Sequence, residues 1–272
     1  MVLRSYHNHS VLCDGHNTLE EMTRAAIDAG MQAIGFTGHG TFPPDLRYCM
    51  KPEDIPAYVA EVNRCKEKYA SQIQIWLGVE NEFYGVPPAF DWDFALGATH
   101  YLYKDGVLYY VDYSPQLQQQ AIREAFGGDP YAMTAWYFGT LAQFPEKMKF
   151  DIVAHFDLVT KFNEGGKMFD EDDSRYWKPA LEAMEHLVKA GCAFEINTGA
   201  VSRGYRTTPY PSRRLLKALC DFGGSIVFGG DSHAVDTVGS YLPEAMELAA
   251  AYGFRTHRVL TQTGWQEVAL GE

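Results

Sequence analysis

Residues 33–40, AIGFTGHG, combine a short apolar run with a histidine placed just after it. A run of this kind predicts a buried strand from Ala33 to Thr37, with His39 beyond its end. The same arrangement recurs along the chain, where short apolar stretches alternate with longer segments of helical periodicity. This alternation is typical of parallel strands joined by crossover helices.

Seven strands are predicted from this pattern. They lie near Val2 to Tyr6, Ala33 to Thr37, Ile73 to Val79, Phe94 to Thr99, Asp151 to Ala154, Cys192 to Ile196 and Ser225 to Phe228. Helices are predicted near Asn17 to Gly30, Glu53 to Tyr69, Pro115 to Ala125, Tyr131 to Phe144, Tyr176 to Ala190, Ser212 to Phe222 and Tyr241 to Tyr252. Seven strands favour an α/β barrel over a small open sheet, and we expect one domain spanning residues 1–272.

The composition narrows the choice of function. The net charge is −12, and the 23 Lys and Arg residues are scattered without a basic run, so no nucleic acid partner is expected. The sequence contains no apolar segment long enough to span a bilayer and no signal peptide, so no membrane partner is expected. The five cysteines are odd in number and include no C-x-x-C pair, which favours reduced thiols in the cytoplasm. The oligomeric state is not indicated.

The histidines carry the chemistry. Seven of the nine fall at or just after the end of a predicted strand, namely His7, His9, His16, His39, His100, His155 and His233. Glu80 and Asp231 occupy the same kind of position. Because the strands of a parallel barrel point the same way, residues beyond their ends converge on one mouth. Nine nitrogen and oxygen donors are too many for one ion and suit about three, with one carboxylate bridging two of them.

These residues lie in short motifs that follow one another along the chain. The motifs are HNH at 7–9, CDGH at 13–16, TGHG at 37–40, GVE at 78–80, ATH at 98–100, AHFD at 154–157 and GGDSH at 229–233. In this order they resemble the polymerase and histidinol phosphatase (PHP) superfamily, in its histidinol-phosphatase branch, over nearly the whole chain. The resemblance implies a distorted (β/α)7 TIM-like barrel with a trinuclear metal centre.

The resemblance also implies a ligand scheme for three divalent transition-metal ions. One ion would be held by His7, His9, Glu80 and Asp231, the second by Glu80, His100 and His155, and the third by His16, His39 and His233. Imidazole with carboxylate suits zinc, iron and manganese alike. Some relatives have Asp where this chain has Gly38, which removes a supporting partner but no ligand.

A loop after the sixth strand carries two candidate phosphate ligands. Residues 197–206, NTGAVSRGYR, contain two arginines, whose planar guanidinium can bind two phosphate oxygens at once. Similar family members have an Asn, a following Arg and a later Pro-Tyr-Pro, here at 209–211. We therefore expect Arg203 to bind the phosphate, with Arg206 in reserve. A surface position is the alternative for either arginine.

Two aspartates and several aromatic residues each have two alternative roles. Asp14 and Asp157 are expected either to orient an imidazole through its second nitrogen or to make turn hydrogen bonds. Aromatic residues predicted in loops either frame an imidazole-bearing substrate or pack against the barrel: Phe42, Tyr48, Tyr101, Tyr103, Tyr109, Tyr110 and Tyr113.

The expected reaction is hydrolysis of a small phosphomonoester, with Glu80, Asp231 and Arg203 as catalytic residues. The resemblance implies L-histidinol phosphate as the substrate. One alternative is a PHP-type phosphoesterase or exonuclease acting on nucleotides or DNA ends, which the acidic chain disfavours. Another is a non-catalytic metal-binding regulatory domain, which the complete donor set and Arg203 disfavour.

Overall fold

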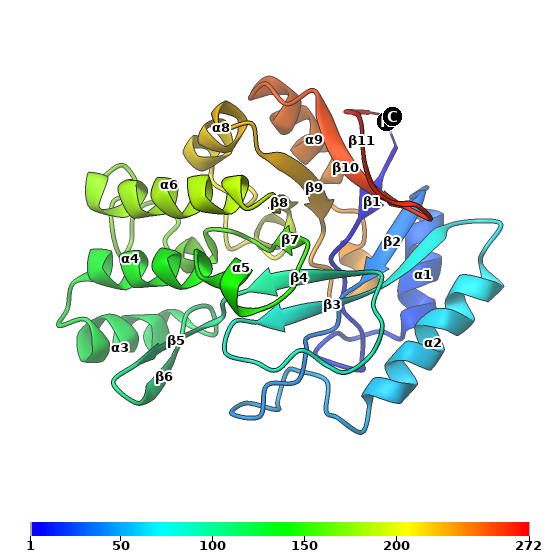
Figure 1. Ribbon diagram of the computed structural model, residues 1–272, viewed down its shortest axis with the longest axis horizontal. Coiled ribbons are helices and arrows are strands. Elements are labelled where there is room, and N and C mark those ends of the chain that lie inside the picture. The colour runs from blue at the N-terminus through cyan, green and yellow to red at the C-terminus, as the bar shows by residue number, and fades with distance from the viewer. Residues whose placement is uncertain (1, 272) are drawn as a thin grey trace.

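The computed structural model describes residues 2–271, and its centre is a barrel of seven parallel strands (Figure 1). The strand order is β1-β2-β3-β4-β7-β8-β9, with parallel pairing throughout. The bounds are Arg4–Ser5, Ala33–Phe36, Gln74–Glu82, Phe94–Ala98, Ile152–Val153, Ala193–Asn197 and Ser225–Gly229. The two edges of the sheet meet, because Tyr6 N donates to Phe228 O at 3.0 Å and Asp231 N to His7 O at 2.8 Å. This nearly closed barrel confirms the predicted fold class and all seven predicted strands.

Helices cover the outside of the barrel (Figure 1). In chain order, α1 to α9 are Leu19–Asp28, Ile55–Lys68, Pro115–Ala125, Pro130–Leu141, Phe144–Lys147, Ser174–Lys189, Gly199–Ser202, Arg213–Asp221 and Leu242–Ala251. Two 3₁₀ turns, η1 and η2, are Leu158–Thr160 and Val235–Thr237. The predicted helix from Tyr131 to Phe144 ends at Leu141. Between β3 and β4 the described chain has a loop where the other neighbouring strands are joined through helices, which makes the barrel irregular. Among residues 2–271 no helix is long and apolar enough to cross a membrane.

The first helix illustrates how local sequence sets an element. Thr18 and Glu21 form a capping box, with Glu21 N donating to Thr18 Oγ1 at 3.2 Å and Thr18 N to Glu21 Oε2 at 2.8 Å. These bonds satisfy amide groups that the first turn leaves free. Leu19, Met22 and Ala26 are buried on the face turned to the barrel.

Two antiparallel hairpins were not predicted. One is β5–β6, Tyr101–Lys104 with Val107–Tyr110, and the other is β10–β11, Thr256–Thr261 with Gly264–Ala269. The first contains tyrosines that the sequence pattern placed in a loop. The second contributes Trp265 and Leu260 to the cluster inside the barrel, at the end opposite the predicted site.

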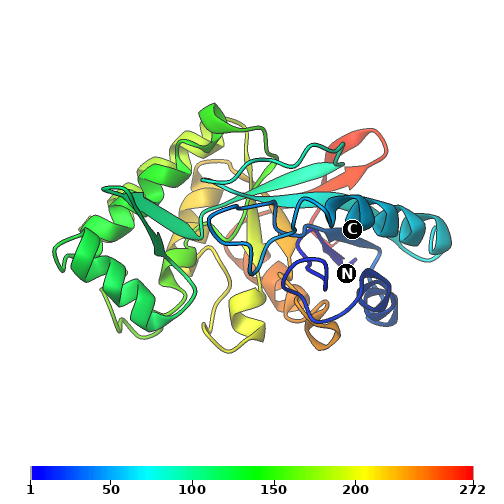
Figure 2. The ribbon, with the colours of Figure 1, turned by 90° about the horizontal axis from the view of Figure 1, so that it is seen from below.

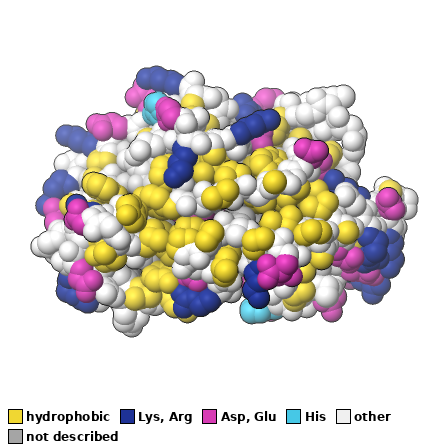
Figure 3. All heavy atoms as spheres, turned by 60° about the horizontal axis from the view of Figure 1, so that its bottom comes forward, with side chains coloured by type: hydrophobic (Ala, Val, Ile, Leu, Met, Phe, Trp, Pro, Cys, Tyr) yellow, Lys and Arg dark blue, Asp and Glu magenta, His cyan; other side chains and the backbone are white. Residues whose placement is uncertain are grey.

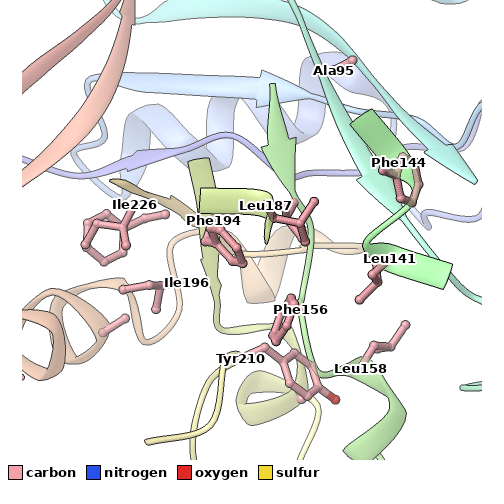
Figure 4. Packing of buried hydrophobic residues seen from close by; sticks show 14 of the residues in the cluster. Ala95, Leu141, Phe144, Phe156, Leu158, Leu187, Phe194, Ile196, Tyr210 and Ile226 are labelled. Carbon is pink, nitrogen blue, oxygen red and sulfur yellow. The ribbon is translucent and has the colours of Figure 1, made fainter. Parts of the chain in front are cut away.

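Side chains of the strands alternate between the outside and the inside of the barrel. The inside is apolar at one end, its floor, and polar at the other end, its mouth. In β3, Ile75, Leu77 and Val79 pack outward in the cluster shared with the helices, whereas Trp76 packs inside the barrel. Since strand side chains alternate, Glu80 and Glu82 follow Trp76 on the inner face. Figure 4 shows the outer layer around β7 and β8, where the rings of Phe156 and Phe194 lie 5.4 Å apart between centroids. Charged groups therefore gather at one end of the barrel interior.

Candidate metal centre

The polar mouth opens into a cavity of about 470 Å³. Its wall contains donors from the loops that follow β1, β2, β4, β7 and β9 and from the end of β3 (Asp14, His16, His39, Glu80, His100, His155, Asp231 and His233). Figure 2 looks toward the side on which the loops after β1, β2 and β8 gather. The structure thus brings together residues that are far apart in the sequence.

The first set of donors surrounds one carboxylate oxygen of Glu80. His7 Nε2 lies 3.1 Å and His9 Nε2 3.6 Å from Glu80 Oε2. Asp231 Oδ1 lies 3.4 Å from His9 Nε2 and 3.7 Å from His7 Nε2. These four side chains are the ones expected to hold the first ion.

The second set uses the other oxygen of Glu80. His155 Nε2 lies 3.0 Å and His100 Nε2 3.5 Å from Glu80 Oε1. Glu80 Oε2 also lies 3.0 Å from His39 Nδ1, so the two oxygens of Glu80 face different sets of imidazoles, as a bridging carboxylate would. His155 and Asp231 adopt positive φ angles of 23° and 49°, an uncommon conformation that clusters at functional sites.

The third set differs from the implied ligand scheme. His39 Nε2 and His233 Nε2 lie 3.6 and 3.3 Å from Asp14 Oδ2, and together with His9 these residues form a group that could hold an ion. His16, the expected third ligand, is exposed on the cavity wall and belongs to none of the candidate groups within the described residues. The reason is a tight turn in which Cys13 N and Gly15 N both donate to Ser10 O, which directs Asp14 inward. Asp14 therefore joins His39 and His233 in this candidate group, while His16 lies on the cavity wall outside it.

The chemistry of these donors fits divalent metal ions. His7 Nε2, His9 Nε2 and Glu80 Oε2 are buried and have no hydrogen-bond partner, although they lie close together. Burial alone raises the pKa of Glu80, but the imidazoles of His39 and His7 hold it well below its usual range. Burial likewise raises the pKa of Asp231, which Arg203 and His7 hold well below its usual range. Ionised carboxylates beside unpaired imidazole nitrogens are a donor set for zinc, iron or manganese.

Arg203 lies beside the cluster, at the expected place. Its Nη2 donates to Asp231 Oδ2 at 2.8 Å and its Nη1 to the Asp231 carbonyl oxygen at 2.7 Å. Gly199 allows this approach, because a Cβ there would lie 2.8 Å from both Arg203 Nη2 and Asp231 Oδ2. The side chain is 28% exposed and lines the cavity, so Arg203 faces both the cluster and the entering ligand.

The expectation that Arg206 binds phosphate is wrong. Its Nη1 donates to Glu171 Oε1 and to Thr160 O, each at 2.8 Å, and its Nε lies 3.2 Å from Glu164 Oε2. The residue is 8% exposed and does not line the cavity. Two carboxylates therefore hold Arg206 inside the loop that carries Arg203.

Asp157, the second aspartate considered as a partner for an imidazole, does not contact one. Its Oδ2 accepts a hydrogen bond from Ser212 N at 3.0 Å, and the side chain is fully buried. Burial raises its pKa to about 6. The position after His155 placed Asp157 near the site in sequence, but the 3₁₀ turn η1 begins here and turns it away.

Two other carboxylates hold imidazoles and were missed in the sequence. Glu195 Oε1 lies 2.8 Å from His7 Nδ1, and Glu82 Oε2 lies 3.1 Å from His100 Nδ1. A signal for both was available. Glu82 shares the inner face of β3 with Glu80, and Glu195 interrupts the apolar strand AFEIN, where a charge requires a partner.

The outer wall of the cavity is aromatic and charged. Tyr48, Tyr101, Tyr110 and Tyr113 line it, whereas Phe42 is buried behind them. Asp45 accepts hydrogen bonds from the hydroxyls of Tyr101 and Tyr110 at 3.0 and 2.9 Å. On the other side, Lys161 Nζ donates to Asp112 Oδ2 at 3.0 Å. Arg47, which pairs with Asp45 at 2.6 Å, also lines the cavity, so Lys161 and Arg47 are cations of the wall that the sequence did not single out.

Comparison with known proteins places this chain in a family. The model of the PHP domain matches residues 5–199. The chain therefore belongs to the PHP domain family.

Individual relatives share most of its length. A Deinococcus radiodurans protein named "Probable histidinol-phosphatase" is 30% identical over 265 residues, which cover 92% of this chain and 94% of that protein. A Schizosaccharomyces pombe protein of the same name is 28% identical, covering 86% and 82% of the two chains. The crystal structure of histidinol phosphate phosphatase from Lactococcus lactis, complexed with zinc, L-histidinol and phosphate, is 19% identical. It superposes with a TM-score of 0.72 over 97% of this chain and 98% of that one, which shows the shared fold.

Proposed function

We propose that this protein is a metal-dependent phosphomonoesterase that hydrolyses L-histidinol phosphate to L-histidinol and inorganic phosphate. The observation that carries the proposal is Glu80, whose two oxygens face separate sets of imidazoles 3.0–3.6 Å away, beside an arginine on the cavity wall. The names of the relatives that match nearly the whole chain support the choice of substrate.

Three divalent transition-metal ions, zinc, iron or manganese, would occupy the cluster. One would be held by His7, His9, Glu80 and Asp231, the second by Glu80, His100 and His155, and the third by His39, His233 and Asp14, with His16 nearby. When bound, such ions lower the pKa of a water molecule and neutralise charge on phosphoryl oxygens.

The chain's own residues would bind and orient the substrate. Arg203 makes three close contacts within the described residues, with two oxygens of Asp231 and with His233 Nδ1 at 3.1 Å. A guanidinium carries five N–H donors, so it retains donors for a phosphate oxygen. Lys161 and Arg47 would supply further positive charge on the cavity wall. Together they favour an anionic group close to the cluster.

The leaving alcohol would contact the outer wall. Tyrosine rings suit an imidazole ring and an ammonium group, whereas the carboxylates of Asp45 and Asp112 already pair with Arg47 and Lys161. The cavity of about 470 Å³ lies within the size range of small-molecule sites. These features support a small, cationic leaving group.

An exonuclease or a nucleotide phosphoesterase is the alternative that the resemblance to the PHP superfamily leaves open. In Figure 3 apolar side chains occupy the middle of the face shown, with positive and negative groups interspersed around it. This face offers a DNA backbone no continuous basic track. A non-catalytic metal-binding domain is disfavoured by the donor set and by Arg203.

A substrate panel tests the proposal. Purified protein, with metal content measured on the same sample, would be assayed against L-histidinol phosphate, other small phosphomonoesters, nucleoside monophosphates and DNA 3′ ends. We expect the highest kcat/KM for L-histidinol phosphate. Higher kcat/KM for a nucleotide substrate would overturn the substrate assignment alone, whereas no hydrolysis by a fully metallated sample would overturn the proposed activity.

A further inference from the structure

Glu195 is a buried carboxylate inside the barrel that connects three strand ends. It lies on β8 and is 1% exposed. Its Oε1 lies 2.8 Å from His7 Nδ1, which follows β1. Its Oε2 accepts from the backbone N–H of His155, after β7, at 2.9 Å and from Asn197 Nδ2 at 3.0 Å. Glu195 therefore touches two of the residues expected to bind metal, without facing the cavity itself.

The neighbours of Glu195 Oε2 are fixed as donors. The amide of His155 is backbone and can only donate. Asn197 Oδ1 accepts from Gly199 N at 2.9 Å, so its NH₂ group faces Glu195. An ionised carboxylate, which only accepts, satisfies both donors at once.

The contact with His7 then defines the protonation of that ring. Since Glu195 Oε1 is an acceptor, His7 Nδ1 carries the proton and donates it. In the neutral form of the ring, the form that binds an ion, the lone pair is left on Nε2, the atom that faces Glu80 and Asp231. A metal ion needs that lone pair.

Gly229 leaves the space that the Glu195 carboxylate occupies. A Cβ at Gly229, on the neighbouring strand β9, would lie 1.7 Å from Glu195 Oε1 and 2.9 Å from His7 Cβ. Any other residue at Gly229 would displace the carboxylate or the ring. The contact between Glu195 and His7 therefore depends on a glycine at position 229 of β9.

We propose that Glu195 is the positioning residue of the metal centre: it holds His7 in the tautomer that presents Nε2 to the ion and fixes the His155 backbone beside it. This inference rests on the proposed metal-dependent function but not on the identity of the substrate. His7 belongs to two of the candidate metal groups, so one carboxylate acts on both.

Glu195→Gln tests the proposal with almost no change of shape. The amide oxygen must face His155 N–H and Asn197 Nδ2, so the amide NH₂ must face His7 Nδ1. The ring would then turn to the tautomer with the proton on Nε2, which cannot bind the ion. We expect zinc affinity, measured by competition with a chelator, to fall about 10- to 100-fold, as for other partners of ligating histidines.

The matched control is Glu171→Gln. Glu171 is paired with Arg206 away from the cavity, so its loss should lower the thermal midpoint but leave zinc affinity unchanged. Unchanged zinc affinity in a folded Glu195→Gln variant, or an equal loss in both variants, would overturn the positioning role. Neither result depends on which phosphoester is hydrolysed.

A measurement on the unmodified protein covers the case in which the variant does not fold. Nitrogen-15 NMR of the zinc-loaded protein should show His7 with a protonated, hydrogen-bonded Nδ1 and a metal-bound Nε2. A His7 ring bound through Nδ1, or lacking a proton there, would overturn the proposal. Gly229→Ala should weaken zinc binding in the same way as Glu195→Gln, because it displaces the same carboxylate.

Discussion

Glu80 lies close to more imidazoles than a single metal ion would bind. It is 1% exposed, and His7, His9, His39, His100 and His155 all lie within 3.6 Å of its oxygens. A buried carboxylate in this position is costly unless positive charge compensates it. The imidazoles of His39 and His7 stabilise the charge of Glu80, and bound ions would take over that role.

Glu80→Gln is expected to impair metal binding and hydrolysis more than Asp157→Asn. The amide cannot bridge two ions, so activity should fall by about 10²-fold or more. Asp157 touches no imidazole and does not line the cavity, so the asparagine variant should stay within about a few-fold of the parent. Steady-state kinetics and elemental analysis of both variants check this. Equal, small losses would contradict the bridging role.

Arg203→Ala is expected to lower kcat/KM for every phosphomonoester alike. The guanidinium would contact the phosphoryl group, which all such substrates share, and the loss should be about 10²-fold. Arg175→Ala, at an exposed position paired with Asp173, serves as the control. A loss confined to one substrate would instead place Arg203 at the leaving group.

At the scale of elements, the hairpin β10–β11 closes the barrel opposite the metal centre. Leu260 N donates to Tyr6 OH at 2.8 Å, and Trp265 packs on Tyr6 with ring centroids 5.1 Å apart. His257, on β10, is 2% exposed and contacts the ring of Phe228. The hairpin therefore brings a titratable ring into an apolar floor.

His257 should make stability depend on pH. Burial, with the charge of Arg4, lowers its pKa from 6.5 to about 4. Below pH 6.5 the unfolded chain binds a proton at His257 that the folded chain does not bind. The contribution of His257 to stability is therefore fully present above that pH and is lost as the pH falls toward 4. Between pH 7 and 5 the parent should lose about 2 kcal/mol more than His257→Gln.

Urea denaturation of the metal-free forms of both proteins at each pH would measure this difference. The comparison removes the contribution of the metal centre, which titrates in the same range. Parallel pH profiles for the two proteins would show that His257 is not the group responsible.

At the scale of the whole molecule, binding of metal ions should couple to folding. The donors come from segments spread from His7 to His233, and the unfolded chain does not hold them together. Ions that bind only the folded state stabilise it, by about 2.7 kcal/mol for one site at a hundredfold excess over Kd.

Metal-saturated protein should therefore hold close to three ions per chain and melt at a higher temperature than chelator-treated protein. Elemental analysis and calorimetry on the same preparation measure both quantities. At most one ion after metal-supplemented expression would contradict a trinuclear centre, and an unchanged melting temperature would contradict the coupling.

The sequence alone determined the seven strands and most of the donors at their ends. Apolar runs and the residues that follow them are local features, and parallel strands in a barrel bring their ends to one mouth whatever the details of packing. The hairpins were less predictable, because their tyrosines fit a loop as well as a short strand. The pairing of their strands depends on tertiary contacts with the rest of the barrel.

Only the tertiary structure decided which side chains face one another. A single turn directs Asp14 inward and leaves His16 exposed, although both follow the same strand. Arg206 is neutralised by carboxylates 35 and more residues away, and Glu195 meets His7 across 188 residues of chain. Such contacts depend on the path of loops and on the register of strands far apart in sequence, which local residue patterns do not encode.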